Sequence, residues 1–130
     1  MPKTKVKPYP KPLLDRMAET SGIIMKARAL VAMGMPDLAQ AAWLAAAVGE
    51  EEVAPGLDQI DRNLEAAVHR ISAASCYKHA GELAKAINLY RAALAGPLAE
   101  SVRMETAQLL AACLAQFTLS ANGKGAIPHG

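Results

Sequence analysis

Three side chains with acid–base or metal-binding chemistry are spaced for one helix face near the middle of the sequence. Asp61, Glu65 and His69 follow one another at intervals of four residues, so in a helix they project from the same side. Two carboxylates and an imidazole can hold a divalent metal ion or transfer a proton. The same spacing is common on solvated faces, and Arg62 and Arg70 lie nearby. We therefore favour a solvated stripe over a site.

A second combination, His69, Cys76 and His79, falls on one broad helix face and could supply soft metal ligands. Structural zinc sites have four ligands and usually include a recognisable second pair. Here the other candidates are Cys113 and His129, which lie far apart in the sequence. A packed thiol is the preferred interpretation of Cys76. A small metal-dependent enzyme or sensor using either face is the alternative function.

Motifs for phosphate binding and nucleophilic catalysis are incomplete in this sequence. The run Gly123-Lys-Gly125 has no preceding strand and no following helix, both of which a phosphate-binding loop needs. Ser75 and Cys76 lie close to His79 but lack the nucleophile elbow and an orienting acid. We therefore expect no cofactor, no catalytic residue and no enzyme activity.

The elements that position these residues are expected to be helices. Hydrophobic residues make up 52% of the 130 residues but aromatic residues only 4%, so Ala, Leu, Ile, Val and Met supply the apolar surface. Ala and Leu are the strongest helix formers, whereas strands favour β-branched and aromatic residues. A chain of this length can bury most of its apolar surface in one core. The composition predicts a single all-α domain.

Glycines, prolines and acidic residues divide the chain into helices. Gly34 and Gly81 can take the left-handed conformation that ends a helix, and Gly96-Pro97 forms another break. The longest break is expected at Glu50–Glu52 and Pro55-Gly56, because acidic residues are disfavoured at a helix C-terminus. Short loops make neighbouring helices antiparallel. Five helices are expected, at about residues 13–33, 36–48, 58–80 (capped by Asp58), 82–95 and 98–119.

Both ends of the chain are expected to lie outside this domain, which covers residues 13–119. Residues 1–12 contain four prolines and four lysines and should form an extended basic arm. Residues 120–130 contain few packing groups and should form a flexible tail. Residues 1–16 have a net charge of +4 and the remainder −2, so the excess positive charge is in the arm.

Composition also limits the partners and the compartment. Nucleic-acid binding is not expected, except through the arm lysines. The arm could instead dock as an extended proline-rich ligand, or simply be a solubilising tail. The sequence contains no uninterrupted apolar stretch of about 18 residues, so a membrane span is not expected. No signal peptide is apparent. The two cysteines lie in Ala-rich runs, which favours free thiols in a reducing cytoplasm. The arm lysines are Lys3, Lys5, Lys7 and Lys11.

An internal repeat appears when Gly34 is aligned with Gly81. Small residues then coincide where two helices of a hairpin must approach closely, and large rings coincide where the space is wider. The interval between the two units is 47 residues. The coinciding pairs are Ala27 with Ala74, Leu30 with Tyr77, Ala39 with Ala86, Trp43 with Tyr90 and Ala46 with Ala93.

This pattern resembles the tetratricopeptide repeat. The match is good over residues 67–97, where Ala74, Tyr77, Gly81 and Tyr90 are followed by a closing proline, and it is looser over residues 20–50. The resemblance implies a right-handed α-solenoid of antiparallel hairpins and a non-catalytic adaptor or scaffold that binds a protein segment. It also implies that the first helix of each hairpin lines the binding groove. The corresponding residues are Ile24, Arg28, Val31, Val68, Ile71, Ser75, Lys78 and His79.

The last expected helix is apolar nearly all round between Leu109 and Leu114, which indicates burial on more than one face. Two repeats make a short solenoid, and three or more are usually needed for stability. We expect either that the first helix folds back over the fifth or that a second copy of the chain covers it, forming a homodimer.

Overall fold

The computed structural model describes residues 7–126, and all the regular secondary structure in that range is α-helix. The side chains are described as far as Ala121. This confirms the all-α class and the five expected helices for the described range. The helices are α1 (Lys11–Ala32), α2 (Pro36–Gln59), α3 (Asn63–His79), α4 (Leu83–Leu94) and α5 (Glu100–Ala126).

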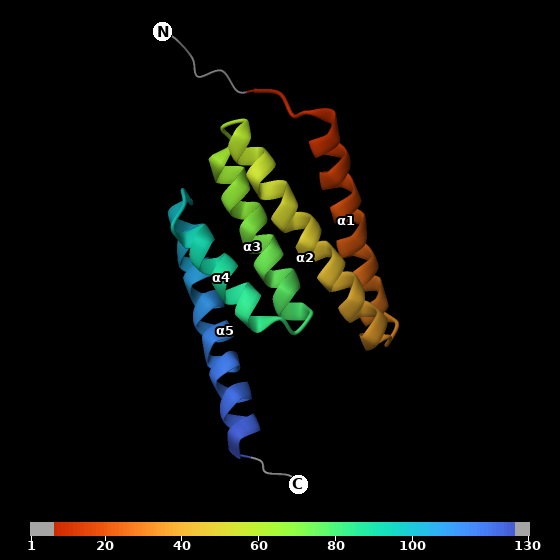
Figure 1. Ribbon diagram of the computed structural model, residues 1–130, viewed down its shortest axis with the longest axis vertical. Helices are drawn as coiled ribbons and strands as arrows, with labels where there is room; N and C mark the ends of the chain where they lie inside the picture. The colour runs from red at the N-terminus through yellow and green to blue at the C-terminus, as the bar shows by residue number, and fades with distance from the viewer. Residues whose placement is uncertain (1–6, 127–130) are drawn as a thin grey trace.

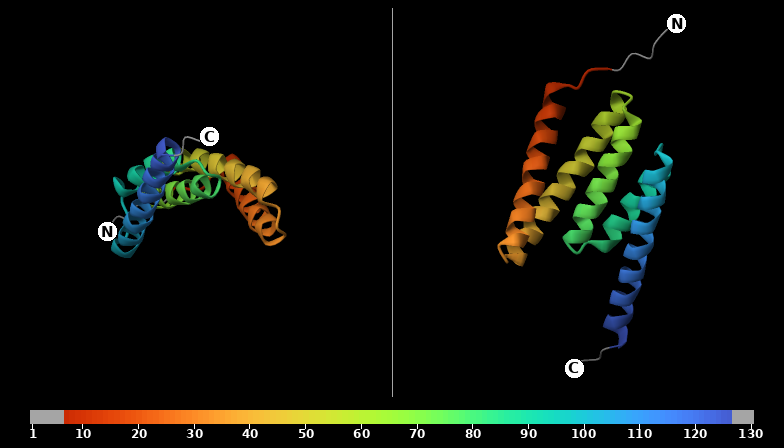
Figure 2. Two further views of the ribbon diagram at one scale, coloured as in Figure 1. Left: turned by 90° about the horizontal axis from the view of Figure 1, so that it is seen from below. Right: turned by 180° about the vertical axis from the view of Figure 1, so that it is seen from behind.

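Each helix packs mainly against the helices next to it in the sequence and runs antiparallel to them (Figure 1). Seen from the end, the helices form a bent layer with α1 at one edge and α4 and α5 at the other (Figure 2). The expectation that the first helix folds back over the fifth is therefore wrong, because α1 packs on α2 instead. No helix between residues 7 and 126 combines the length and apolar character that crossing a bilayer requires.

Three of the turns share one hydrogen-bond pattern, the Schellman motif. In each, the amide just beyond the turn bonds back to a carbonyl inside the preceding helix: Met35 to Leu30, Arg62 to Leu57, and Glu82 to Tyr77. The residue before that amide has positive φ: 72° at Gly34, 62° at Asp61 and 87° at Gly81. Glycine has no Cβ to clash there, and Asp tolerates this conformation better than most residues.

Small residues dominate the core, as the internal repeat predicts. In the five coinciding pairs of that repeat, every residue is buried except Leu30, which is half-buried against the main cluster. Alanines at these positions allow the helix backbones to approach closely, and the rings of Trp43, Tyr77 and Tyr90 fill the wider spaces between them. A second, smaller cluster forms around Val53 and Leu57 near the other end of α2.

The long break predicted at Glu50–Glu52 and Pro55-Gly56 is wrong, because α2 continues to Gln59. Each of the three glutamates has a partner on a neighbouring helix. Glu50 lies 2.8 Å from Nδ1 of His69, Glu51 accepts a hydrogen bond of 2.7 Å from the Tyr77 hydroxyl, and Glu52 pairs with Arg16 at 2.6 Å. The acidic run is therefore held in the helix by tertiary contacts.

Pro55 lies inside α2, where a proline costs about 3 kcal/mol because it removes a backbone hydrogen bond. Val53, Ala54 and Leu57 around it are all buried in the second cluster. Burying a large aliphatic side chain contributes about 1.5–3 kcal/mol, so these residues together offset the proline. The helix ends only at Gln59, and its C-cap Ile60 lies just before the positive φ of Asp61.

Two further boundaries differ from the prediction. Asp58 lies in the last turn of α2 rather than capping the third helix, and its carboxylate accepts hydrogen bonds from Asn63 and Arg70. These bonds lower the pKa of Asp58, with the Arg70 contact the largest cause. α5 continues to Ala126, past the expected end at residue 119, so the expected tail begins as helix.

The second half of the expected arm packs against the body. Tyr9 donates a hydrogen bond of 2.8 Å to Glu65, and the Arg62 guanidinium lies 3.9 Å from the centre of the Tyr9 ring. Nζ of Lys7 pairs with Asp61 at 3.2 Å, and Lys11 already belongs to α1. Lys3 and Lys5 lie outside the described residues. Residues 7–10 of the expected extended arm thus pack against the body, and residues 11–12 belong to α1.

Candidate functional site

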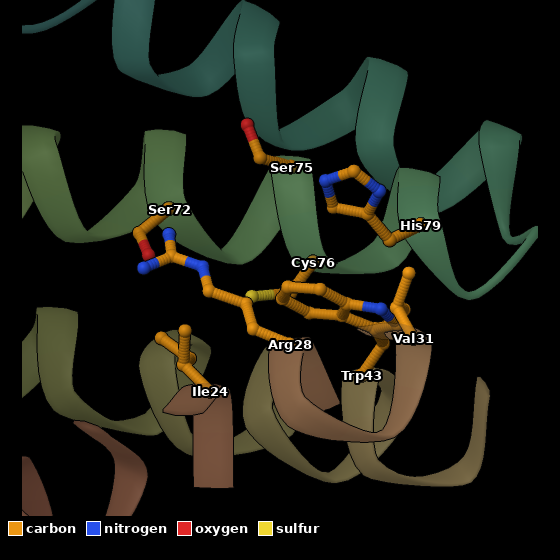
Figure 3. A pocket seen from close by; sticks show the side chains of 8 residues that line it. All are labelled: Ile24, Arg28, Val31, Trp43, Ser72, Ser75, Cys76 and His79. Atoms are coloured by element: carbon orange, nitrogen blue, oxygen red, sulfur yellow. The ribbon is translucent and has the colours of Figure 1, made fainter. Parts of the chain in front are cut away.

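A pocket of about 340 Å³ opens between α1 and α3, with α2 beneath it (Figure 3). Ile24, Arg28 and Val31 lie at successive turns on one face of α1 and form one wall. Four residues of α3 form the other wall, and Trp43 reaches in from α2. The α3 residues are Ser72, Ser75, Cys76 and His79.

Trp43 and His79 stack at the centre of this site. Their ring centroids are 4.5 Å apart and the planes are inclined by 26°. Burial lowers the pKa of His79, and the nearby charges of Lys78 and Arg28 lower it further. The imidazole is therefore neutral at pH 7, and the stack presents an uncharged aromatic surface with a polar edge.

A second cavity of about 460 Å³ lies on the far side of this stack and shares Val31, Trp43 and His79 with the first. Lys78 lines it, together with polar groups at the ends of α2 and α3 and Gln116 of α5. The two cavities make one depression, which we call the α1–α3 groove, with the Trp43–His79 stack across its middle.

The positive charge in the first cavity comes from Arg28. This side chain forms no ion pair within the described residues, so its guanidinium donors are available to an acceptor from solution. The hydroxyls of Ser72 and Ser75 line the opposite wall, although Ser75 already shares a hydrogen bond of 2.9 Å with Tyr90. An apolar floor and a cation suit a ligand with both apolar and acidic groups.

Cys76 is a buried thiol at the base of the groove and is not activated as a nucleophile. Burial raises its pKa to about 11; the charge of Glu50 raises it as well, while Arg28 opposes the shift. A thiol attacks substrates as the thiolate, so a raised pKa suppresses its reactivity. Cys76 therefore acts chemically as a small apolar group here, with 3% of its surface exposed.

The structure brings together five of the eight groove residues that the sequence predicts. Ile24, Arg28, Val31, Ser75 and His79 all line the first cavity. Of the other three, Lys78 lines the adjoining cavity, Val68 is exposed and lines neither cavity, and Ile71 packs against the main core.

Three lining residues were not among the predicted ones: Trp43, Ser72 and Cys76. Trp43 matches Tyr90 in the internal repeat and for that reason suggested packing alone. Trp43 both packs in the core, where it is only 7% exposed, and lines the groove with part of its indole ring. Ser72 could have been found from the sequence, because it precedes His79 by two helical turns on the same face.

The Asp61, Glu65 and His69 combination does not converge. Asp61 lies in the turn before α3 and pairs with Lys7. Glu65 accepts hydrogen bonds from Tyr9 and from Arg62. His69 points to α2, where it contacts Glu50.

The His69, Cys76 and His79 combination also separates, because His69 contacts Glu50 while His79 stacks on Trp43. No group of three His, Cys, Asp or Glu residues in the described part of the chain is arranged to hold a metal ion. The geometry thus gives no support to the metal-dependent alternative.

Comparison of this chain with protein-family models, curated proteins and solved structures finds no match.

Proposed function

We propose that this protein is a non-catalytic binding module of the tetratricopeptide-like type, which receives a peptide segment in the α1–α3 groove. In this proposal α1 with α2 and α3 with α4 are the two hairpins, and they form a short right-handed solenoid. The protein acts as an adaptor or scaffold in the cytoplasm, where its two buried cysteines persist as thiols.

The observation that supports this function most directly is the composition of the groove walls. Two helices that are separated by α2 in the sequence present apolar, hydroxyl and cationic side chains to one open depression. Binding sites are typically apolar concavities with a few polar groups that fix orientation. Walls whose side chains repeat at successive helical turns suit an elongated ligand rather than a compact one.

The charges of the groove indicate the composition of that ligand. Arg28 lies in one cavity and Lys78 in the other, so a segment that crosses the Trp43–His79 stack meets a positive charge on each side of it. Asp37 at the far end of the second cavity is the acidic group among the lining residues. The favoured ligand is a peptide with acidic residues flanking an apolar or aromatic side chain placed on the stack.

A displayed library of random peptides, selected on the intact protein, tests this function. We expect the selected sequences to contain acidic residues beside an apolar or aromatic residue. Replacing Arg28→Glu should weaken their binding by at least about tenfold, since a hydrogen bond to a charged group contributes about 1.5–3 kcal/mol. Fluorescence polarisation with labelled peptides measures the affinities.

Arg91→Glu is the matched control, because Arg91 is exposed on α4 and its replacement makes the same change in net charge away from the groove. Lys78→Glu reports whether the ligand extends past the stack into the second cavity. Circular dichroism verifies that each variant is folded. A library that yields no acidic-apolar peptides, or peptides that bind Arg28→Glu and Arg91→Glu equally, would refute the groove assignment.

A further inference from the structure

The imidazole of His79 lies at the centre of the α1–α3 groove and is open to solvent. It lines both cavities, and its ring stacks on Trp43 with the ring centroids 4.5 Å apart (Figure 3). His79 is an exposed residue, whereas Trp43 beneath it is buried. A ligand that crosses the stack therefore meets the imidazole first, and protons from solvent reach the same ring.

Few charged side chains surround this imidazole. Lys78 precedes it on α3, Arg28 reaches the first cavity from α1, and Asp37 lines the second cavity from α2. Among the described residues, α4 contributes none to either cavity, and α5 contributes the neutral Gln116. Two cations and one carboxylate thus give the groove a net charge of +1 when His79 is neutral, and protonation of His79 raises it to +2.

The charge of His79 changes in a range where lysine and arginine keep theirs. Histidine is the side chain that ordinarily gains a proton between about pH 8 and 5. Partial burial, and after it the charges of Lys78 and Arg28, lower the pKa of His79 from the ordinary value of 6.5. The thiol of Cys76 has a pKa of about 11 and stays protonated throughout this range. The positive charge of the groove therefore increases below pH 6.5, through His79.

The indole of Trp43 supports the protonated form of the ring stacked on it. A cation over the face of an aromatic ring is attracted by the electron density of that ring, and tryptophan gives the strongest contact of this kind. The two planes are inclined by only 26°, so an imidazolium at His79 lies over the indole face. Protonation therefore adds a charge to the groove while the stack stays closed, and the surface that the ligand meets keeps its shape.

We propose that protonation of His79 controls ligand binding in the α1–α3 groove, so that acidic ligands bind more tightly as the pH falls. The inference rests on the proposed peptide-binding function, because it names a control of the same site. A ligand carboxylate beside the imidazolium favours the protonated form of the ring. The proton raises the affinity for the ligand, and by linkage the bound ligand raises the affinity of His79 for its proton by the same factor.

A labelled peptide of sequence Gly-Glu-Phe-Glu-Gly, which places an aromatic ring between two carboxylates, tests this dependence by fluorescence polarisation. Its affinity for the full chain should rise about tenfold from about pH 7.5 to about pH 5. A neighbouring carboxylate shifts a pKa by about one unit or more, and one unit corresponds to about tenfold in affinity. The glutamates of the peptide ordinarily titrate near about pH 4.3, so the peptide keeps most of its charge over this range.

His79→Gln should remove this rise in affinity, because the glutamine amide stays neutral over the whole range. His69→Gln is the matched control, since it makes the same replacement at a histidine that contacts Glu50 at 2.8 Å and lines neither cavity. Its pH dependence should equal that of the original protein. Glutamine is a good helix former, and circular dichroism at both pH values verifies that the two variants are folded.

Trp43 is the only tryptophan of the chain, so its fluorescence reports the charge of the stacked ring without any ligand. The emission should change in one step below pH 6.5, a step that His79→Gln removes and that saturating peptide moves to higher pH. Peptide binding that Arg28→Glu weakens, but whose pH dependence His79→Gln leaves unchanged, overturns the proton link and leaves the binding function standing. A peptide that binds at neither pH refutes the function, and the link with it.

Discussion

At the residue scale, the groove between α1 and α3 shows how burial decides what a reactive side chain can do. Cys76 and His79 are both potential catalysts by type, and both line the site. Burial raises the pKa of the thiol and lowers that of the imidazole, so each is kept in its neutral form. Arg28 is left as the charged group of the first cavity, which favours binding over chemistry.

The raised pKa of Cys76 predicts slow alkylation. With a pKa of about 11 instead of 9.0, its thiolate fraction at pH 8 falls by about 100-fold. Iodoacetamide should modify Cys76 in the native protein at least about 100-fold more slowly than in urea-unfolded chain. Peptide mapping by mass spectrometry distinguishes it from Cys113.

The same shift gives stability a defined pH dependence. The unfolded chain releases the Cys76 proton near pH 9 and the folded chain only near pH 11. Deprotonation of Cys76 above pH 9 therefore favours the unfolded state, and the stability that the protonated, buried thiol contributes is lost as the pH rises towards 11.

Equal alkylation rates of Cys76 in folded and unfolded protein at pH 8 would contradict the burial of this thiol.

At the element scale, the packing of α1 on α2 depends on a close approach at Gly49. A methyl group at this position would overlap the hydroxyl of Thr20, which is fully buried and donates a hydrogen bond of 2.8 Å to the Arg16 carbonyl. The glycine thus sets the distance between the two helices.

Gly49→Ala should lower the free energy of unfolding by about 1–3 kcal/mol, measured by urea denaturation. A helical Gly→Ala change alone stabilises by about 1 kcal/mol, but forced overpacking costs more. Gly22→Ala in α1 is the control, because a methyl group there meets nothing within 4 Å and should stabilise. In the double variant Thr20→Ala/Gly49→Ala the loss should be less than the sum of the single losses. A Gly49→Ala protein as stable as the original would show that the helices can separate at no cost.

The helices themselves could be predicted from the sequence wherever glycine ends them, because Gly34 and Gly81 both adopt the expected positive φ. The same turn at Asp61 was missed, since its carboxylate suggested a metal ligand and no glycine is present. The continuation of α2 through Glu50–Glu52 could not be foreseen either. It depends on partners from other helices, such as His69 and Arg16, whose positions follow only from the tertiary fold.

Part of the groove could be predicted from the spacing of residues along single helices. Positions on α1 and α3 follow from helical spacing, so residues such as Arg28 and His79 were found. Trp43 reaches the groove from a different helix, and spacing along one helix cannot reveal that. The stack of Trp43 on His79 is likewise a contact between helices.

At the scale of the whole molecule, residues 7–10 close the end of the layer where α2 turns into α3. Tyr9 packs against the cluster around Val53 and Leu57 while its hydroxyl bonds to Glu65. Its contact with Glu65 is the first cause of a raised pKa of the Tyr9 hydroxyl. The segment before α1 thus joins the N-terminal region to the middle of the chain.

Removing this contact should destabilise the protein. Tyr9→Ala, which loses both the hydrogen bond and the apolar packing of the ring, should lower the melting temperature by roughly 5 °C. Tyr9→Phe, which loses only the hydrogen bond, should lower it less. Thermal unfolding followed by circular dichroism measures both. Lys11→Ala is the control, since its ion pair with Asp15 is exposed and should contribute little. Full stability of Tyr9→Ala would mean that the segment is not held in solution.

The order in which the helices pack has a consequence for how the chain folds. In the described residues the main contacts join each helix only to its neighbours in sequence. Contacts between residues close in the chain require little loop closure, and domains rich in them fold in microseconds to milliseconds. Folding can therefore start at any hairpin and spread to the next. The second half of α5, where every residue from Ala115 to Ala121 is exposed, should show the fastest amide exchange with solvent.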